Sequence, residues 1–244
     1  MAFYRSDALV LRRFTLGEAD RLVVFLTRDR GKVRAVARSA QRARSRFAGA
    51  LEPLTHIHLE YYGRENAEVF RANSVDVLRS FDRLRQDYDK LKGALVLAEL
   101  LDRLLEDGAE QPALFDLALG VLERMEAKDS IEDPLILFEI RFLRELGYQP
   151  NLDRCGRCGK NLAEKGAVYR AGVAELTCRS CSSGGIRLSP GGVKHLIAVS
   201  SLPLPRAFQV SAMRPVQGEV QRFLHAFLTG VSGARLKSLR FLNS

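Results

Sequence analysis

The sequence lacks the features of several large protein classes. No stretch of its 244 residues approaches the roughly 18 consecutive apolar residues that a membrane span requires. The opening segment, Met1 to Asp7, does not place an apolar run after a basic one, so we expect no signal peptide. We therefore expect a cytoplasmic protein without a membrane partner.

Enzyme signatures are also missing. The sequence contains no G-x-x-x-x-G-K-S/T phosphate loop, no G-x-G-x-x-G after an expected strand, no H-E-x-x-H and no G-x-S-x-G. Acidic residues are numerous, but no pair stands out as an acid–base couple. We therefore predict that the protein is not an enzyme, and a metal-dependent nuclease is the less favoured alternative.

Cysteine is scarce, and its four residues form two pairs of C-x-x-C spacing with nineteen residues between the pairs. This spacing is typical of a zinc site with four thiolate ligands. Because the protein supplies every ligand, we predict a structural Zn²⁺ rather than a catalytic one, held by Cys155, Cys158, Cys178 and Cys181. Two disulfides or a redox-active C-x-x-C pair are the alternatives.

Acidic residues are few in the first fifth of the chain. Residues 1–50 contain 12 Lys and Arg against 4 Asp and Glu, whereas the rest of the chain contains 26 against 25. Nearly all of the formal net charge of +9 therefore belongs to the N-terminal segment. Charge of one sign concentrated in this way favours a polyanionic partner, above all a nucleic acid.

The first 75 residues have the pattern of β-structure. Short runs rich in Val and Leu, bounded by turn residues, predict strands at residues 8–11, 21–26, 32–37, 55–62 and 67–72. Gly31, after Asp29 and Arg30, predicts a hairpin between the second and third strands. Five short strands in this length predict a small closed barrel such as the OB-fold.

From about residue 80 the apolar residues recur with helical spacing. One stripe predicts a single long helix, through Leu84, Tyr88, Leu91, Leu95, Ala98, Leu101 and Leu105. Further helices are predicted from Pro112 to Met125, and from Asp133 as N-cap to Gly147. Two more begin at Ser189-Pro190 and at Pro215.

The cysteine pairs lie between these helices. Residues 168–170 and 174–177, which flank Gly172, predict the hairpin of a zinc ribbon. The predicted fold is therefore α+β and multidomain. Its parts are an OB-fold at residues 1–79, an α-helical domain at 80–149 and 187–244, and an inserted four-cysteine zinc ribbon at 150–186.

The segment from Arg38 to Phe47 contains no acidic residue and no regular apolar period. Together with the preceding strand it predicts a basic surface, and Arg suits phosphate because its planar guanidinium binds two oxygens at once. The predicted DNA-binding residues are Lys32, Arg34, Arg38, Arg42, Arg44 and Arg46. A mobile, solvated loop without a partner is the alternative.

Several aromatic and histidine side chains lie near this surface in the sequence. Each of the aromatic residues is expected in the core, with base stacking as the alternative, at Phe47, Tyr61, Tyr62 and Phe70. His56 and His58 share one face of a strand, but no third ligand is visible, so we expect ordinary strand positions. His195 and His225, in helical segments, have the same interpretation.

Longer motifs resemble the bacterial RecO family. These are GEADR at 17–21 followed by FLTRDRGK at 25–32, LEP at 51–53, LF at 114–115, FEIRFLRELGYQP at 138–150, and LKSLRFL at 236–242. The resemblance covers nearly the whole chain. The chain departs from it at Ser39 and Ala43, where the family loop usually has a Gly and a Pro.

This resemblance implies a non-enzymatic DNA-repair mediator of the RecF pathway. Such a protein binds single- and double-stranded DNA, promotes strand annealing and acts where the recombinase RecA is loaded on SSB-coated DNA. The implied partners are DNA, the RecR protein and the single-stranded-DNA-binding protein SSB. An RNA-binding OB and zinc-ribbon protein of translation is the alternative.

Overall fold

The computed structural model describes residues 1–65, 67–128, 130–233 and 236–239. The chain divides into two compact units, Met1–Ala127 and Lys128–Leu239. The first unit contains the barrel and the three helices that follow it. Within the described residues, no helix combines the length and the hydrophobicity that a membrane crossing requires.

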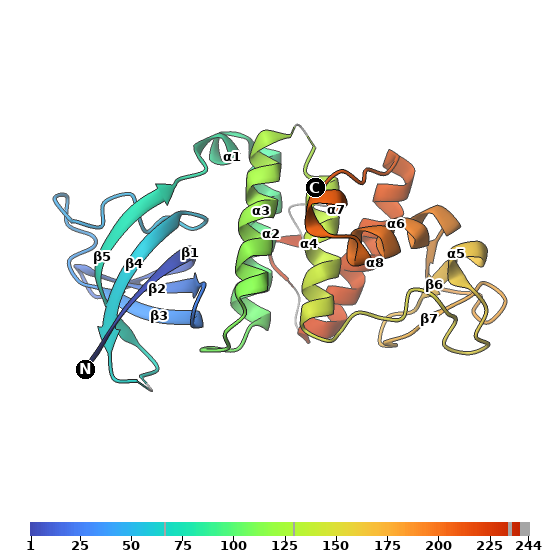
Figure 1. Ribbon diagram of the computed structural model, residues 1–244, viewed down its shortest axis with the longest axis horizontal. Helices are drawn as coiled ribbons and strands as arrows, with labels where there is room; N and C mark the ends of the chain where they lie inside the picture. The colour runs from blue at the N-terminus through green and yellow to red at the C-terminus, as the bar shows by residue number, and fades with distance from the viewer. Residues whose placement is uncertain (66, 129, 234–235, 240–244) are drawn as a thin grey trace. The chain divides into compact units, whose positions relative to one another are not determined.

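The first unit contains a closed five-stranded barrel with the strand order β1-β2-β3-β5-β4 (Figure 1). All neighbouring strands are antiparallel except β3 and β5, whose short parallel pairing closes the barrel. The strands are β1 (Ala2–Leu16), β2 (Asp20–Thr27), β3 (Gly31–Ala37), β4 (His56–Gly63) and β5 (Phe70–Arg79). The predicted N-terminal barrel is confirmed.

Inward side chains alternate along each strand and fill the barrel. Val23 and Phe25 of β2, with Ala35 of β3, are fully buried in this core, as the two-residue period of a strand requires. Gly31 begins β3 with a φ of 60°, and a Cβ atom there would lie 1.9 Å from the carbonyl oxygen of Ala109. Only glycine meets both conditions, and the predicted hairpin is confirmed.

Two strands differ from their predicted extents. β1 covers fifteen residues rather than four, because its two halves pair with different neighbours: Ala2 to Leu9 with β4, and Ala8 to Leu16 with β2. β5 begins at Phe70 and extends to Arg79, beyond the predicted end at residue 72. None of residues 73–79 is buried, so no buried apolar run marks this end of the strand.

Helices α1 (Asp82–Gln86), α2 (Tyr88–Leu104) and α3 (Pro112–Ala127) complete the first unit (Figure 1). The predicted single helix is interrupted at Asp87, whose backbone is extended and whose carboxylate accepts hydrogen bonds from the first-turn amides of α2. The predicted stripe is also wrong in part, since Tyr88 is 67% exposed and Leu95 is 38% exposed. The buried face turns instead towards Leu97 and Leu100.

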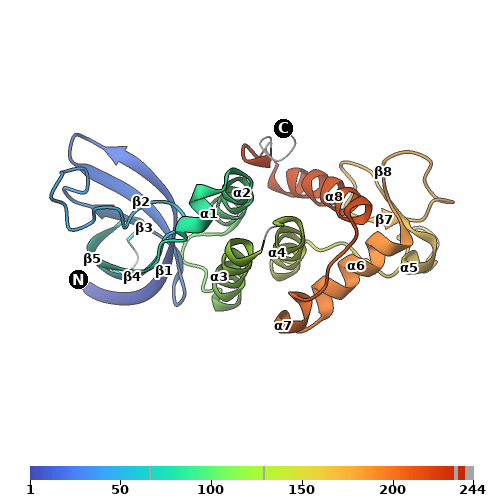
Figure 2. The same ribbon diagram turned by 90° about the horizontal axis from the view of Figure 1, so that it is seen from above.

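The second unit is built around three helices. Helix α4 packs against α6 and α8, and α6 also contacts α8 (Figure 2). A three-stranded sheet of order β7-β6-β8 lies against α8. The elements are α4 (Glu132–Glu145), α5 (Leu162–Lys165), β6 (Ala167–Tyr169), β7 (Leu176–Thr177), β8 (Ile186–Leu188), α6 (Pro190–Ser201), α7 (Leu204–Ala207) and α8 (Arg214–Ser232).

Ser189 caps α6 as predicted, with its side chain accepting a hydrogen bond from the Gly192 amide. Asp133, by contrast, lies inside the first turn of α4 rather than at its N-cap. Its carboxylate accepts hydrogen bonds from Ser211 and Gln217 at 2.6 and 2.9 Å. Tertiary partners therefore replace the predicted local cap.

The C-terminal end of α6 is held by two arginines of α4. Arg141 donates to the carbonyl oxygens of Val199 and Leu202, and Arg144 donates to that of Ser200. The last carbonyls of a helix have no partner within the helix, and cations near that end are favourable. The family-like segment that contains Arg141 and Arg144 is therefore a structural brace.

Candidate nucleic-acid interface and metal centre

The segment from Arg38 to Phe47, which we call the basic loop, is anchored where it leaves β3. The Ser39 amide donates to Oδ1 of Asp20 at 2.7 Å, and the Gln41 amide donates to the carbonyl of Ala19 at 2.9 Å. The Gln41 side chain also donates to the Asp20 carbonyl. These bonds tie the loop to the turn between β1 and β2.

The far end of the basic loop is anchored by burial. Phe47 is 1% exposed and, with Leu51, enters the barrel core. Just beyond it, Glu52 forms an ion pair with Arg13 of β1, and the Arg85 guanidinium donates to the carbonyl of Pro53 at 2.6 Å. The loop is therefore fixed at both ends by side chains of its own unit.

The arginines of the basic loop point into solvent. Arg38, Arg42, Arg44 and Arg46 are all exposed. Within the described part of the chain none of them forms an ion pair, and only Arg46 has a ring contact, 5.0 Å from the Phe47 centroid. Four cations on an anchored loop can bind phosphate oxygens without first breaking an internal pair.

The structure places the other two predicted contacts differently. Lys32 is only 6% exposed, and its Nζ atom donates to the Asp102 carbonyl at 2.6 Å and lies 3.2 Å from Asp107. The Arg34 guanidinium lies 3.1 Å from the second carboxylate oxygen of Asp107. Lys32 is therefore a buried structural cation, and Arg34 is already neutralised.

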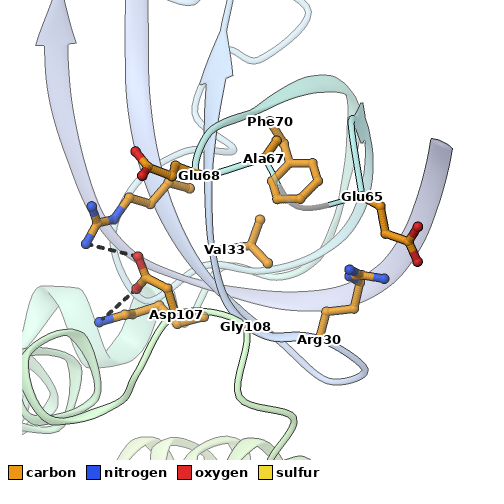
Figure 3. A pocket seen from close by; sticks show the side chains of 10 residues that line it. Arg30, Val33, Glu65, Ala67, Glu68, Phe70, Asp107 and Gly108 are labelled. Atoms are coloured by element: carbon orange, nitrogen blue, oxygen red, sulfur yellow. Dashed lines mark ion pairs between the residues drawn. The ribbon is translucent and has the colours of Figure 1, made fainter. Parts of the chain in front are cut away.

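A cavity of about 600 Å³ opens beside this ion-pair group (Figure 3). Val33 and Phe70 give it an apolar floor, and its rim carries Arg30 together with Glu65 and Glu68. Carboxylates of the loop after β4 and of the α2–α3 connection thus face the cations. This mixture of signs makes the cavity a poorer phosphate site than the basic loop.

The aromatic residues named from the sequence are mostly core residues. Tyr61 is fully buried and stacks on Tyr4 with ring centroids 5.2 Å apart, and Phe70 packs edge-on against both. Burial raises the pKa of Tyr61 to about 12. Phe47 is buried as well, and Tyr62 is partly buried. Core packing, the expected interpretation, therefore holds for Phe47, Tyr61 and Phe70.

The histidines form no metal site within the described residues. Nδ1 of His58 lies 3.1 Å from Asp7, and Nε2 of His56 lies 3.9 Å from the same carboxylate. Burial lowers the pKa of His56, against the opposing effect of Asp7. Burial likewise lowers the pKa of His195. His56, His58 and His195 are therefore ordinary strand and helix positions.

The four cysteines of the second unit converge. Their Sγ atoms all lie within 4.8 Å of one another, and all four thiols are free. The Sγ atoms of Cys158 and Cys178 lie 3.6 Å apart. A tetrahedral Zn²⁺ with bonds of about 2.3 Å separates its sulfur ligands by about 3.8 Å, so the thiols fit such an ion. The predicted convergence is confirmed.

Two tight turns and a hairpin create this arrangement. The Gly159 amide donates to the Cys155 carbonyl in the first turn, and the Cys181 amide donates to the Cys178 carbonyl in the second. The antiparallel pairing of β6 with β7 confirms the predicted ribbon hairpin. The Gly156 amide donates to the Leu176 carbonyl of β7 at 3.0 Å, which joins the first turn to the strand that leads into the second. Gly172 joins β6 and β7 with a φ of 82°.

The environment of the sulfurs favours thiolate at part of the cluster. Burial raises the pKa of Cys155, but backbone amides, including that of Cys178 at 3.2 Å, bring it down to about 6. Hydrogen bonding with Cys158 and Cys178 instead raises the pKa of Cys181 to about 12. Four thiolates this close repel one another unless a cation lies between them, which is the condition for a metal site.

Comparison with known proteins identifies the family. The family model described as "Recombination protein O N terminal" matches residues 1–81, and "Recombination protein O C terminal" matches residues 85–240. The chain belongs to the RecO family. The two matches together span both units, so the RecO assignment covers the barrel and the four-cysteine ribbon alike.

Individual RecO relatives agree with these matches. The DNA repair protein RecO of Anaeromyxobacter dehalogenans is 36% identical over 242 residues, covering 98% of this chain and 95% of the relative. Those of Symbiobacterium thermophilum and Myxococcus xanthus are 32% and 33% identical, over 100% and 99% of this chain and 98% of each relative.

These findings confirm the family that the sequence motifs predict. The relatives are named as DNA repair proteins, in agreement with the prediction that the chain is not an enzyme. The FEIRFLRELGYQP motif begins in α4 and contains Arg141 and Arg144, which bind the last carbonyls of α6. Of the closing family-like segment, residues 236–239 are described, and residues 240–242 lie outside the described residues.

Proposed function

We propose that this RecO family member is a DNA-binding mediator of recombinational repair in the RecF pathway. It binds single- and double-stranded DNA, promotes annealing of complementary strands, and helps to load recombinase on SSB-coated DNA. Its protein partners are RecR and SSB, and it acts in the cytoplasm. The observation that supports this proposal best is the anchored basic loop with its exposed arginines.

The number of arginines in the basic loop predicts how strongly DNA affinity should depend on salt concentration. DNA binding releases counterions, and the logarithm of the binding constant falls with the logarithm of salt concentration by about 0.9 per duplex phosphate neutralised. Contacts from Arg38, Arg42, Arg44 and Arg46 would give a slope of about −3.6 on duplex and about −2.8 on single strands. Lys32 is left out of this set because its ammonium group is buried.

The four cysteines are proposed to hold a structural Zn²⁺. The ligands would be Cys155, Cys158, Cys178 and Cys181, whose sulfurs already converge. With every position filled by protein, the ion supplies a cross-link between the two turns rather than a reactive water. Its contribution is therefore to hold the Cys155–Cys158 turn against the Cys178–Cys181 turn that follows β7.

Strand annealing tests the proposed function. Complementary labelled strands are coated with SSB, and duplex formation is followed with and without this protein. We expect faster annealing with the protein, and unchanged annealing would contradict the proposal. Preference for a structured RNA competitor over single-stranded DNA would support the translation alternative. Shortening of the strands when Mg²⁺ is added would support a nuclease.

A further inference from the structure

The outer face of the barrel carries a continuous row of side chains across four strands. In the strand register, Phe14 of β1 pairs with Leu22 of β2, Leu22 pairs with Val36 of β3, and Val36 pairs with Arg71 of β5. Residues paired in this way project from the same face of a sheet. We call these four residues the Phe14 row.

The Phe14 row differs from the neighbouring row in the pairing of its charged side chains and in the exposure of its apolar ones. Phe14 is 39% exposed, Leu22 and Val36 are partly buried, and Arg71 is exposed. The neighbouring row joins Arg12, Val24 and Arg34. There Val24 is buried, and both arginines are paired with carboxylates, Asp102 and Asp107, that end or follow α2.

A cation lies at each end of the Phe14 row. The Arg12 guanidinium lies 4.4 Å from the centroid of the Phe14 ring at one end, and Arg71 occupies the other. Arg38 follows Arg34 and Val36 at the same two-residue spacing, just beyond the end of β3. It is the first residue of the basic loop. Adjacent strands lie about 4.8 Å apart, so the row spans about 14 Å.

We propose that Phe14 is a stacking platform for an unpaired base of single-stranded DNA. The phosphates of the same strand are bound by Arg38, Arg71 and the basic loop. This inference rests on the proposed DNA-binding function and names the ligand feature that the Phe14 row recognises. Proteins that bind single strands combine an electropositive track with aromatic rings in this way, since every base offers a π-face.

The ring distinguishes unpaired from paired DNA. In a duplex the faces of the bases are stacked on one another and cannot reach a surface side chain without being unstacked. The arginines, in contrast, bind phosphate in either form. Phe14 therefore adds affinity for single strands alone, which is the preference that a protein acting on coated single strands requires.

The absence of tryptophan from the chain allows a direct test. Phe14→Trp introduces a single reporter, whose fluorescence is recorded during titration with oligothymidylate, with a blunt-ended duplex of two strands, and with polyphosphate. We expect quenching by oligothymidylate only. Phe3→Trp is the matched control, because Phe3 is also on β1, is 51% exposed and has an arginine, Arg5, 5.5 Å from its ring.

Affinity gives a second readout. Phe14→Leu keeps an apolar side chain but removes the ring, and we expect at least a fivefold loss of single-strand affinity. Duplex affinity and the salt dependence should stay unchanged, as should all binding by Phe3→Leu. Wild-type single-strand affinity in Phe14→Leu, or equal quenching at Phe14→Trp and Phe3→Trp, would overturn the inference.

The same titrations separate the two proposals. If the wild-type protein binds neither single-stranded nor duplex DNA, the proposed function fails, and the stacking inference fails with it. If it binds both, but quenching at Phe14→Trp is the same with polyphosphate as with oligothymidylate, only the stacking inference fails. If Phe14→Leu lowers the affinities for single-stranded and duplex DNA by the same factor, the stacking inference also fails while the proposed function stands.

Discussion

The carboxylate of Asp107 lies 3.2 Å from the Nζ atom of Lys32, although the two residues are far apart in the sequence. Its other oxygen pairs with Arg34 at 3.1 Å. Asp107→Asn should release the Arg34 guanidinium, which is about half exposed, to bind phosphate. We expect tighter DNA binding and a salt slope steeper by about one unit, measured by fluorescence anisotropy at several salt concentrations.

Glu110→Gln is the control for this variant. Glu110 belongs to the same connection between α2 and α3, is exposed, and has no ion pair among the described residues. The two substitutions change the net charge equally. Equal effects on DNA affinity would show that only overall charge matters and that the pairing of Asp107 with Arg34 does not.

Replacing Arg42, Arg44 and Arg46 together with Ala should weaken binding to every DNA sequence. Up to about three phosphate contacts are lost, so the salt slope on duplex should flatten by up to about 2.7. The control removes the same charge through Arg5, Arg28 and Arg83, which are exposed on the same unit. An equal change in slope for both triple variants would exclude the basic loop as the binding site.

Ser39→Gly should stabilise the first unit. Ser39 has a φ of 56°, a conformation that costs a side-chain-bearing residue about 1 kcal/mol, and glycine adopts it freely. Against this, glycine loses more backbone entropy on folding, so we expect a net gain of about 0.5 kcal/mol. Denaturant unfolding measures the difference. Ser39→Ala keeps the strained backbone and should bring no gain; a gain as large as that of glycine would contradict the explanation.

Cys178→Ser should lower metal content and thermal stability together, because ribbon folding and metal binding are coupled. Metal analysis and thermal melting of the same samples check this. A chelator should lower the melting temperature of the wild-type protein but leave that of the variant unchanged. A wild-type protein that is free of metal and fully stable would exclude the structural zinc.

His225 gives the second unit a pH dependence. Burial lowers its pKa, but Glu139, fully buried with its Oε1 3.4 Å from Nε2, raises it more, and the net shift is upward from 6.5. The stabilisation by the charged imidazole is therefore complete below about pH 6.5 and is lost as pH rises through the folded-state pKa. We compare the free energies of unfolding of the wild-type protein and of His225→Gln. The difference between them should accordingly become smaller as pH rises from about 6 to 8. A loss that is constant across this range would argue against the charged pair.

Local patterns in the sequence predict the features that local chemistry determines. The glycine turn before β3, the Ser189 cap and the paired C-x-x-C turns each depend on a few neighbouring residues, and the structure contains all three. The helical stripe fails at Tyr88 because the capping carboxylate of Asp87 interrupts the helix and turns its buried face.

The remaining features depend on contacts between distant segments. Nothing near Lys32 in the sequence indicates that Asp107 will neutralise it, since only the folding of α2 and α3 onto the barrel brings them together. Phe14 was not among the sequence candidates for a related reason. Its exposure follows from the register of three strand pairs, which the two-residue period of β1 alone does not specify.

The double pairing of β1 also has a consequence for the order of folding. The ladder from β1 through β2 to β3 joins segments that are neighbours in sequence, so it can form through short loop closures. Closure of the barrel instead requires Ala2 to meet Gly63, and Val36 to meet Arg71, across much longer loops. Three of the four strands that present the Phe14 row can therefore assemble early during synthesis, while the interior behind them is sealed only after β5 has left the ribosome.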